Sequence, residues 1–225
     1  GEVLAEHTTL TLAAIDSRVL DALGEVRLPQ ASKFVTFPSE LSRGQAQRAM
    51  LAAALVKAPR LLVADEPLTG LDAGVAAAIL ALIRDMQAKR DMAMIFVTHD
   101  LAQVAALADR TAVMYGGRIV EVGQTADVFH QPRHPYTEGL LQSIPRPGLH
   151  RLQPIDGDVP KITDIPPGEC ALVPRCRYAE PVCVGGVPTL EAGEPRSAAC
   201  FRATSLVLRG VGDDNQIGPG SHRLE

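Results

Sequence analysis

The sequence predicts an α/β protein with a mainly parallel sheet flanked by helices, followed by an irregular segment. Short apolar runs alternate with longer segments of helical periodicity in the first part of the chain. Small apolar residues are abundant, whereas aromatic residues make up 4% and Trp is absent, which favours helix–sheet packing over a β-sandwich. Ten of the 17 prolines lie between Pro145 and Pro195, so the regular fold is expected to end near residue 145.

Helical periodicity recurs through the first half of the chain. Thr11 to Leu23 is predicted to form a helix. Ser42 is a favourable N-cap, and Gln45 three residues later completes a capping box, so a further helix begins here. Residues 75–86 carry apolar side chains at helical spacing, and Leu101 to Leu107 is predicted to be a short helix.

Strands are predicted between and after these helices. Arg60–Asp65 and Met92–Thr98 contain unbroken apolar runs, which are typical of strands buried on both faces of a parallel sheet. Thr111–Tyr115 and Arg118–Val122 flank Gly116-Gly117, a strong hairpin signal. We therefore expect residues 1–58 to be helical, 59–144 to form the α/β core, 145–203 an irregular extension and 204–225 a loosely held tail.

Charge and hydropathy exclude some classes of protein. The formal net charge of −4 gives no reason to expect nucleic-acid binding, which usually requires a basic patch. No apolar run approaches the ~20 residues of a membrane span. The first residues lack a basic-then-apolar secretion signal, so a cytosolic location is expected.

Two adjacent carboxylates, Asp65 and Glu66, end the first predicted strand. Ligands bind at the carboxyl ends of the strands in parallel sheets. One carboxylate there could hold Mg²⁺ while the other orients and polarises an attacking water. The alternative is an acid pair favoured by the dipole at the start of a helix.

Motifs on both sides of this acid pair decide between these alternatives. They are Leu41-Ser42-Arg43-Gly44-Gln45, Thr69-Gly70-Leu71-Asp72 and Val97-Thr98-His99-Asp100. Together with Asp65-Glu66 they resemble the signature motif, Walker B, D-loop and H-loop of ABC-type ATPases, in order and at similar spacing. The resemblance covers about residues 2–203. It implies the C-terminal part of an ABC-type nucleotide-binding domain, with part of the helical subdomain in residues 1–58 and a RecA-like ATPase core in 59–144.

The resemblance also implies ATP and Mg²⁺ as cofactors, and it assigns roles to these residues. Asp65 would hold magnesium, Glu66 would act as base, and His99 would contact the γ-phosphate. Asp72 would communicate across a dimer of two nucleotide-binding domains. For His99 the alternative is a hydrogen-bonded histidine that ends a strand.

The signature residues would contact the γ-phosphate of a nucleotide held by the partner domain. Ser42, Gly44 and Gln45 match the motif and begin a helix, whose N-terminus suits a phosphate. Arg43 departs from the commoner glycine at the third signature position.

A phosphate-binding loop of the form G-x-x-x-x-G-K-S/T does not occur in the 225 residues. Upstream of the signature the only glycines are Gly1 and Gly24. We therefore expect a truncated gene product, an excised domain or the second segment of a split protein. The family is one of ATPases, but the chain alone is expected to bind ATP weakly and to turn it over negligibly.

Four cysteines are spaced C-x5-C-x6-C-x16-C, at Cys170, Cys176, Cys183 and Cys200. The spacing lacks the C-x2-C pairs of zinc ribbons and differs from common ferredoxin patterns. Four thiolates within about thirty residues suit one metal site, and unrelated free cysteines are the alternative.

The segment His134-Pro135-Tyr136-Thr137, with Leu140-Leu141, resembles an element of oligopeptide, dipeptide and nickel importers. Their C-terminal extension carries cysteines, and in some members these hold a 4Fe–4S cluster. The resemblance implies such a cluster at the four cysteines, with zinc as the alternative. His134 is expected to be a turn residue rather than a ligand.

The predicted function is ATP binding and hydrolysis that energises the import of oligopeptides or dipeptides in a bacterium. The resemblance implies a peripheral location on the cytoplasmic membrane face, with transmembrane permease subunits and a second nucleotide-binding domain, identical or different, as partners. A solute-binding protein outside the cytoplasm would act indirectly. The alternatives are a non-catalytic module that supplies the signature half of a composite ATP site and a non-transport ABC ATPase.

Overall fold

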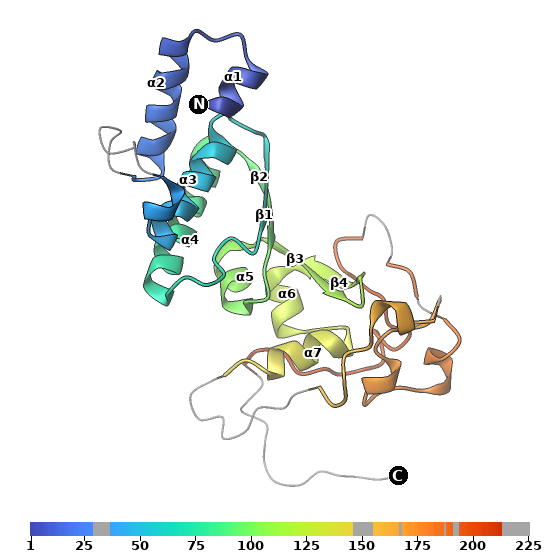
Figure 1. Ribbon diagram of the computed structural model, residues 1–225. Coiled ribbons are helices and arrows are strands. Elements are labelled where there is room, and N and C mark those ends of the chain that lie inside the picture. The colour runs from blue at the N-terminus through green and yellow to red at the C-terminus, as the bar shows by residue number, and fades with distance from the viewer. Residues whose placement is uncertain (29–36, 146–154, 167, 187, 191–193, 213–225) are drawn as a thin grey trace. The chain divides into compact units, whose positions relative to one another are not determined.

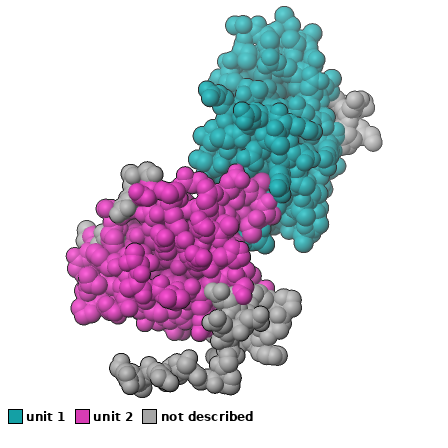
Figure 2. All heavy atoms as spheres, turned by 180° about the vertical axis from the view of Figure 1, so that it is seen from behind, with its two compact units in different colours: residues 1–103 teal, residues 104–225 magenta. Residues whose placement is uncertain are grey.

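The computed structural model describes residues 1–28, 37–145, 155–166, 168–186, 188–190 and 194–212. These residues fall into two compact units, which divide between Gln103 and Val104 (Figure 2). Among the helices in the described ranges, none has the length and apolarity needed to cross a bilayer.

The first unit is built largely of helices whose starts are capped by side chains. The helices before the sheet are α1 (Glu2–His7), α2 (Leu12–Glu25), the 3₁₀ turn η2 (Pro38–Glu40) and α3 (Arg43–Leu55). Helix α4 (Ala73–Arg90) follows the first strand, and α5 (Leu101–Leu107), within which the two units divide, follows the second. Thr11, Ser42 and Asp72 cap α2, α3 and α4 through side-chain oxygens. The helices predicted from periodicity are therefore confirmed.

A parallel pair of strands lies against these helices (Figure 1). The strands are β1 (Leu61–Asp65) and β2 (Ala93–Val97), with Leu61 opposite Ala93 and Asp65 opposite Val97. One face contributes Leu62 and Met94 to a core formed with α2, α3 and α4.

The other face of this pair is exposed, and its apolar side chains are between 46% and 60% accessible to solvent: Leu61, Val63, Ile95 and Val97. The prediction that both faces are buried is therefore wrong for the described chain. Helices cover one side of the pair, and no described residues of the first unit form a layer on the other side.

The second unit contains an antiparallel hairpin of β3 (Arg110–Tyr115) and β4 (Arg118–Gln124). Gly116 and Gly117 join the strands with φ of 56° and 76°, a left-handed conformation that glycine adopts without strain. The hairpin predicted from these glycines is confirmed. The short strand β5 (Ser197–Ala198) pairs with β4, and the sheet order is β3-β4-β5.

Helices α6 (Thr125–His130) and α7 (Pro135–Gln142) follow the hairpin. The described part of the extension contains only 3₁₀ turns besides β5, namely η3 (Ile162–Asp164), η4 (Val173–Arg175) and η5 (Pro181–Cys183). Its predicted irregular character is thus confirmed, while the four-part division of the chain stays a prediction.

The first residues of the expected tail are held against the second unit. Leu208 is buried, and the amide of Val211 donates to the carbonyl of Phe129 at 2.7 Å. Gly210 passes so close to His130 that an added Cβ would lie 2.1 Å from its carbonyl oxygen. The expectation of a loosely held tail is therefore wrong for residues 206–211, and residues 213–225 lie outside the described ranges.

Candidate functional site

The predicted catalytic residues lie at the carboxyl ends of β1 and β2. Asp65 ends β1, Glu66 follows it, and His99 stands two residues beyond the end of β2. Because the strands are parallel and in register, both ends lie at one edge of the pair. The amide of Glu66 donates to the carbonyl of Val97 at 2.9 Å, so the first residue after β1 is still tied to β2.

The structure brings Glu66 and His99 into direct contact. Glu66 Oε1 lies 2.7 Å from His99 Nδ1 and accepts from the His99 backbone amide at 3.2 Å. Glu66 Oε2 accepts from the hydroxyl of Thr69 at 2.6 Å. Both side chains remain open to solvent, with 38% of Glu66 and 77% of His99 exposed. A solute at this edge can therefore reach both.

These contacts shift the pKa of each partner. The hydrogen bond from Thr69, followed by that from His99, lowers the pKa of Glu66. The hydrogen bond and charge of Glu66 raise the pKa of His99. Glu66 is therefore ionised at neutral pH, and an ionised carboxylate accepts hydrogen bonds, as a group that orients water must.

Asp65 offers an exposed hard oxygen ligand at the same strand end. Within the described ranges, no three side chains of His, Cys, Asp and Glu are grouped to hold a metal ion. Asp65 could still fit Mg²⁺, because this ion commonly binds one or two carboxylates and takes its other ligands from water and phosphate.

The signature residues form the start of α3. Ser42 Oγ accepts from the Gln45 amide at 3.3 Å, and Gln45 Oε1 accepts from the Ser42 amide at 3.0 Å. The predicted capping box is therefore confirmed. Gly44 packs against α4, since an added Cβ would lie 2.7 Å from a methyl group of Val75.

The residues of the D-loop motif lie beside the signature. Arg43 Nη1 donates to the carbonyl of Gly70 at 2.8 Å. Asp72 Oδ1 accepts from the amide of Val75 at 2.9 Å and so caps α4. Thr69, the first residue of the D-loop motif, joins this group to Glu66, because its hydroxyl donates to Glu66 Oε2 at 2.6 Å.

The four cysteines line one small cavity in the second unit, together with His134. All four are free thiols, and the cavity is about 20 Å³, about the size of one water molecule. Burial, with the nearby thiols, raises the pKa of Cys176 and Cys200. Thiol ligands suit iron or zinc, but in the described structure they are not spaced as a metal-binding group.

His134 is the N-cap of α7, as its expected role in a turn suggests. Its Nδ1 accepts from the amide of Tyr136 at 3.1 Å. Burial lowers the pKa of His134 to about 4, so the ring is neutral at neutral pH.

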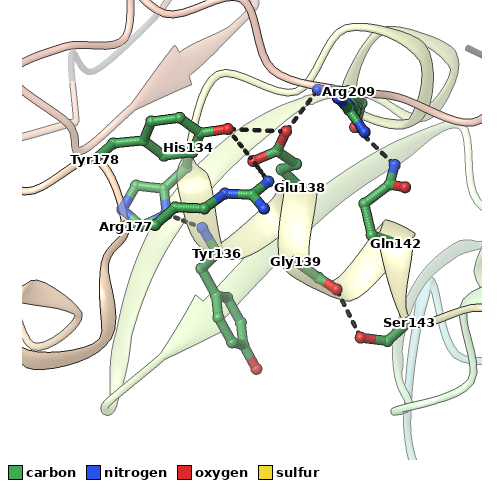
Figure 3. A network of polar contacts seen from close by, with 9 residues as sticks. All are labelled: His134, Tyr136, Glu138, Gly139, Gln142, Ser143, Arg177, Tyr178 and Arg209. Atoms are coloured by element: carbon green, nitrogen blue, oxygen red, sulfur yellow. Dashed lines mark hydrogen bonds and ion pairs between the residues drawn. The ribbon is translucent and has the colours of Figure 1, made fainter. Parts of the chain in front are cut away.

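Two buried carboxylates were not anticipated from the sequence. Glu138 of α7 accepts from Arg177 Nη2 at 2.7 Å, from the hydroxyl of Tyr178 at 2.9 Å and from the amide of Arg209 at 2.9 Å (Figure 3). Glu121 accepts from the amides of Arg133 and His134 at 2.9 and 3.0 Å. The only sequence signal was an acidic residue within an apolar segment. These contacts fasten the extension and the residues near 209 to the hairpin and α7.

Comparison with known proteins adds independent evidence. A family model described as "ABC transporter" matches residues 2–69, and one described as "Oligopeptide/dipeptide transporter, C-terminal region" matches residues 120–183. The dipeptide transport ATP-binding protein DppD of Bacillus subtilis (strain 168) is 43% identical over 186 residues, which cover 81% of this chain and 55% of that protein. The oligopeptide transport ATP-binding protein OppD of Salmonella typhimurium is 41% identical over 212 residues, covering 92% and 62%.

A solved structure supports the fold alone. It shows a metal-chelate type ABC transporter in an inward-facing conformation, with a TM-score of 0.50 and 24% identity over 58% of this chain and 52% of that one. The fold and the ordered motifs define part of an ABC-type ATP-binding domain. By both family models and these relatives, the chain is similar to the ATP-binding subunits of the oligopeptide/dipeptide ABC transporter family. It spans about three fifths of the length of the curated relatives it matches.

Proposed function

We propose that this chain supplies the signature and carboxylate parts of an ATP site that energises import of oligopeptides or dipeptides in a bacterium. The observation that carries the proposal is the contact between Glu66 and His99 at the strand ends, flanked by the signature and D-loop residues. The relatives are named for dipeptide and oligopeptide transport, which supports the class of solute.

Each residue at the strand ends has a separate proposed role in hydrolysis: binding the metal, orienting the water or contacting the γ-phosphate. Asp65 would hold Mg²⁺, which neutralises charge that develops on the phosphates. Glu66, ionised and exposed, accepts a hydrogen bond from the attacking water and fixes its direction. His99 touches Glu66 and would donate to the γ-phosphate, so one histidine couples the water-orienting group to the presence of nucleotide.

The signature helix acts on a nucleotide held by a second ATP-binding domain. The exposed N-terminus of α3, with Ser42 and Arg43, would face that γ-phosphate, because helix N-termini attract anions. Asp72 caps α4 beside this helix and would transmit the approach of the second domain to the turn that carries Thr69.

A phosphate-binding loop must come from outside these 225 residues, because they contain no such string. The exposed apolar face of β1 and β2 supports this requirement, since side chains such as Val63 and Ile95 are rarely left open on a sheet. We propose that a segment with further strands and the loop covers this face. Without it the chain turns over ATP negligibly.

The family relationship supports a peripheral position against transmembrane permease subunits on the cytoplasmic face. A solute-binding protein would deliver solute from the other side. A second ATP-binding domain, identical or different, completes the two sites.

The cysteine cavity supports a more limited proposal. The four thiols share one cavity, and the family resemblance suggests a 4Fe–4S cluster or zinc in that place. Burial raises the pKa of Cys176 and Cys200, so binding of a metal there would require their deprotonation. Iron and sulfide in equal amounts in anaerobically purified protein would support a cluster. Stoichiometric zinc without iron would support the alternative, and absence of both would end the proposal.

Reconstitution tests the main proposal. The chain, alone and combined with a loop-bearing segment of a relative, is assayed for ATP hydrolysis and for recovery of a permease from solubilised membranes. Hydrolysis only in the combined sample, with a permease recovered, is expected. Hydrolysis by the chain alone, lost in Glu66→Gln, would contradict the need for a separate loop. Permease binding without hydrolysis in the combined sample would favour a non-catalytic module, and recovery of ribosomes or DNA a non-transport ATPase.

A further inference from the structure

Thr69 lies on the turn that follows β1 and touches the proposed water-orienting carboxylate. Its hydroxyl donates to Glu66 Oε2 at 2.6 Å, while its amide donates to the Glu66 carbonyl at 3.2 Å. Between the two residues, Leu68 is buried at 4% exposure and fixes the turn to the unit. The hydroxyl of Thr69 is thus presented to the carboxylate by backbone that is itself anchored.

The backbone of Glu66 is in an unusual conformation. Its φ of 47° lies in the left-handed region, which residues other than glycine rarely adopt. Such a conformation persists where surrounding contacts determine it, and it is concentrated at functional sites. Here the contacts are the bond from the Glu66 amide to Val97, the Thr69 hydroxyl and the His99 amide.

The two carboxylate oxygens have different partners. Oε1 faces the amide and Nδ1 of His99, whereas Oε2 faces only the Thr69 hydroxyl among the described residues. Rotation about the last side-chain bond of Glu66 would exchange the oxygens and turn the carboxylate plane away from His99. A β-branched threonine has few side-chain rotamers, so its hydroxyl opposes this rotation more firmly than a flexible donor would.

We infer that Thr69 is a positioning residue, whose hydroxyl holds the carboxylate of Glu66 in the plane that keeps Oε1 against His99. The inference rests on the proposed function of Glu66 and extends it to Thr69, to which that function assigns no role of its own. A purely structural role in the turn would depend on the Thr69 amide, which any non-proline residue keeps. Removing only the hydroxyl therefore tests the positioning role and leaves the structural role of the amide in place.

The test compares Thr69→Val, which keeps the shape of the side chain and removes the hydroxyl, with Thr69→Ser, which keeps the hydroxyl. The signal is the backbone amide proton of His99 at fixed pH in the 225-residue chain, measured by NMR. Glu66→Gln gives the reference chemical shift of this amide proton when its acceptor carries no charge. The amide of Val63 in β1 reports whether the strands are intact.

We expect Thr69→Val to move the His99 signal at least half of the way to its position in Glu66→Gln, and Thr69→Ser to restore it, with Val63 unmoved in both. In a subunit completed with the loop, Thr69→Val should lower kcat about tenfold at unchanged KM. A His99 signal that is the same in Thr69→Val and the parent chain overturns the inference. Full ATP turnover by Glu66→Gln would instead overturn the proposed function, so the two failures are distinguishable.

Discussion

Glu66 in the first unit and Glu138 in the second are both carboxylates that accept several hydrogen bonds, but their surroundings differ. Glu66 is 38% exposed, and its side-chain partners Thr69 and His99 stand just beyond the ends of two strands. Glu138 is 1% exposed, and its partners Arg177, Tyr178 and Arg209 come from distant parts of the chain.

The difference separates a carboxylate that we propose orients water from one that stabilises the fold. Glu66 keeps access to solvent, so a water molecule can bind to it, and its loss removes little packing. Glu138 is enclosed by donors, and its loss would leave the part-buried hydroxyl of Tyr178 and the amide of Arg209 without this acceptor. Replacing Glu138 should therefore affect stability, and replacing Glu66 should affect chemistry.

Glu138→Ala should cause the largest loss of stability. Removal of a buried, hydrogen-bonded carboxylate is expected to lower the free energy of unfolding of the second unit by about 3 kcal/mol. Chemical denaturation followed by circular dichroism measures the loss. The control is Glu180→Ala, because Glu180 pairs with Arg202 at 2.7 Å but is 49% exposed, and an exposed pair contributes about 0–1 kcal/mol. Equal losses in both variants would contradict the structural role of Glu138.

The stability of the second unit should also depend on pH through His134. Its pKa is about 4 in the folded chain and about 6.5 when unfolded, so the unfolded chain binds more protons between these values. Stability therefore falls as the pH drops from about 6.5 to about 4, by about 3 kcal/mol in total. His134→Asn keeps a favourable N-cap and removes the titration. In this variant the denaturation midpoint should depend much less on pH. An unchanged pH dependence would show that other groups cause it.

A smaller effect is expected where α3 meets α4. Gly44→Ala would place a methyl group 2.7 Å from the stiff side chain of Val75, and such overpacking costs about 1–3 kcal/mol. Gly24→Ala is the matched control in α2, since no atom lies within 4 Å of the added Cβ. It should stabilise the first unit by about 0.5 kcal/mol. The midpoints of thermal unfolding of the two variants are compared. A Gly44→Ala variant as stable as the parent chain would contradict the close packing of α3 against α4.

Local features were predictable from the sequence because they depend on neighbours in the chain. The capping box of Ser42 and Gln45, the hairpin glycines and the acid pair at the end of β1 were all assigned correctly to their elements. The assignment of function drew on the order of four short motifs, and the ABC transporter family model covers the first two of them within residues 2–69.

Features that depend on distant segments were not predictable. The apolar run of β1 indicated burial on both faces, but a run alone does not say which segments cover it. Glu138 resembles any acid on a helix until Arg177 and Arg209 are placed beside it. Thr69 became a candidate only when its hydroxyl was found on Glu66.

The most direct test of the account is steady-state ATP hydrolysis by the subunit completed with its phosphate-binding loop, measured for the parent, Glu66→Gln and Glu138→Gln at a temperature where all three are folded. Glu66→Gln should lower kcat at least about 100-fold while leaving the unfolding midpoint within error. Glu138→Gln should lower the midpoint and retain kcat. Hydrolysis that persists in Glu66→Gln, or that is lost equally in both variants, would contradict the division between a reactive and a structural carboxylate.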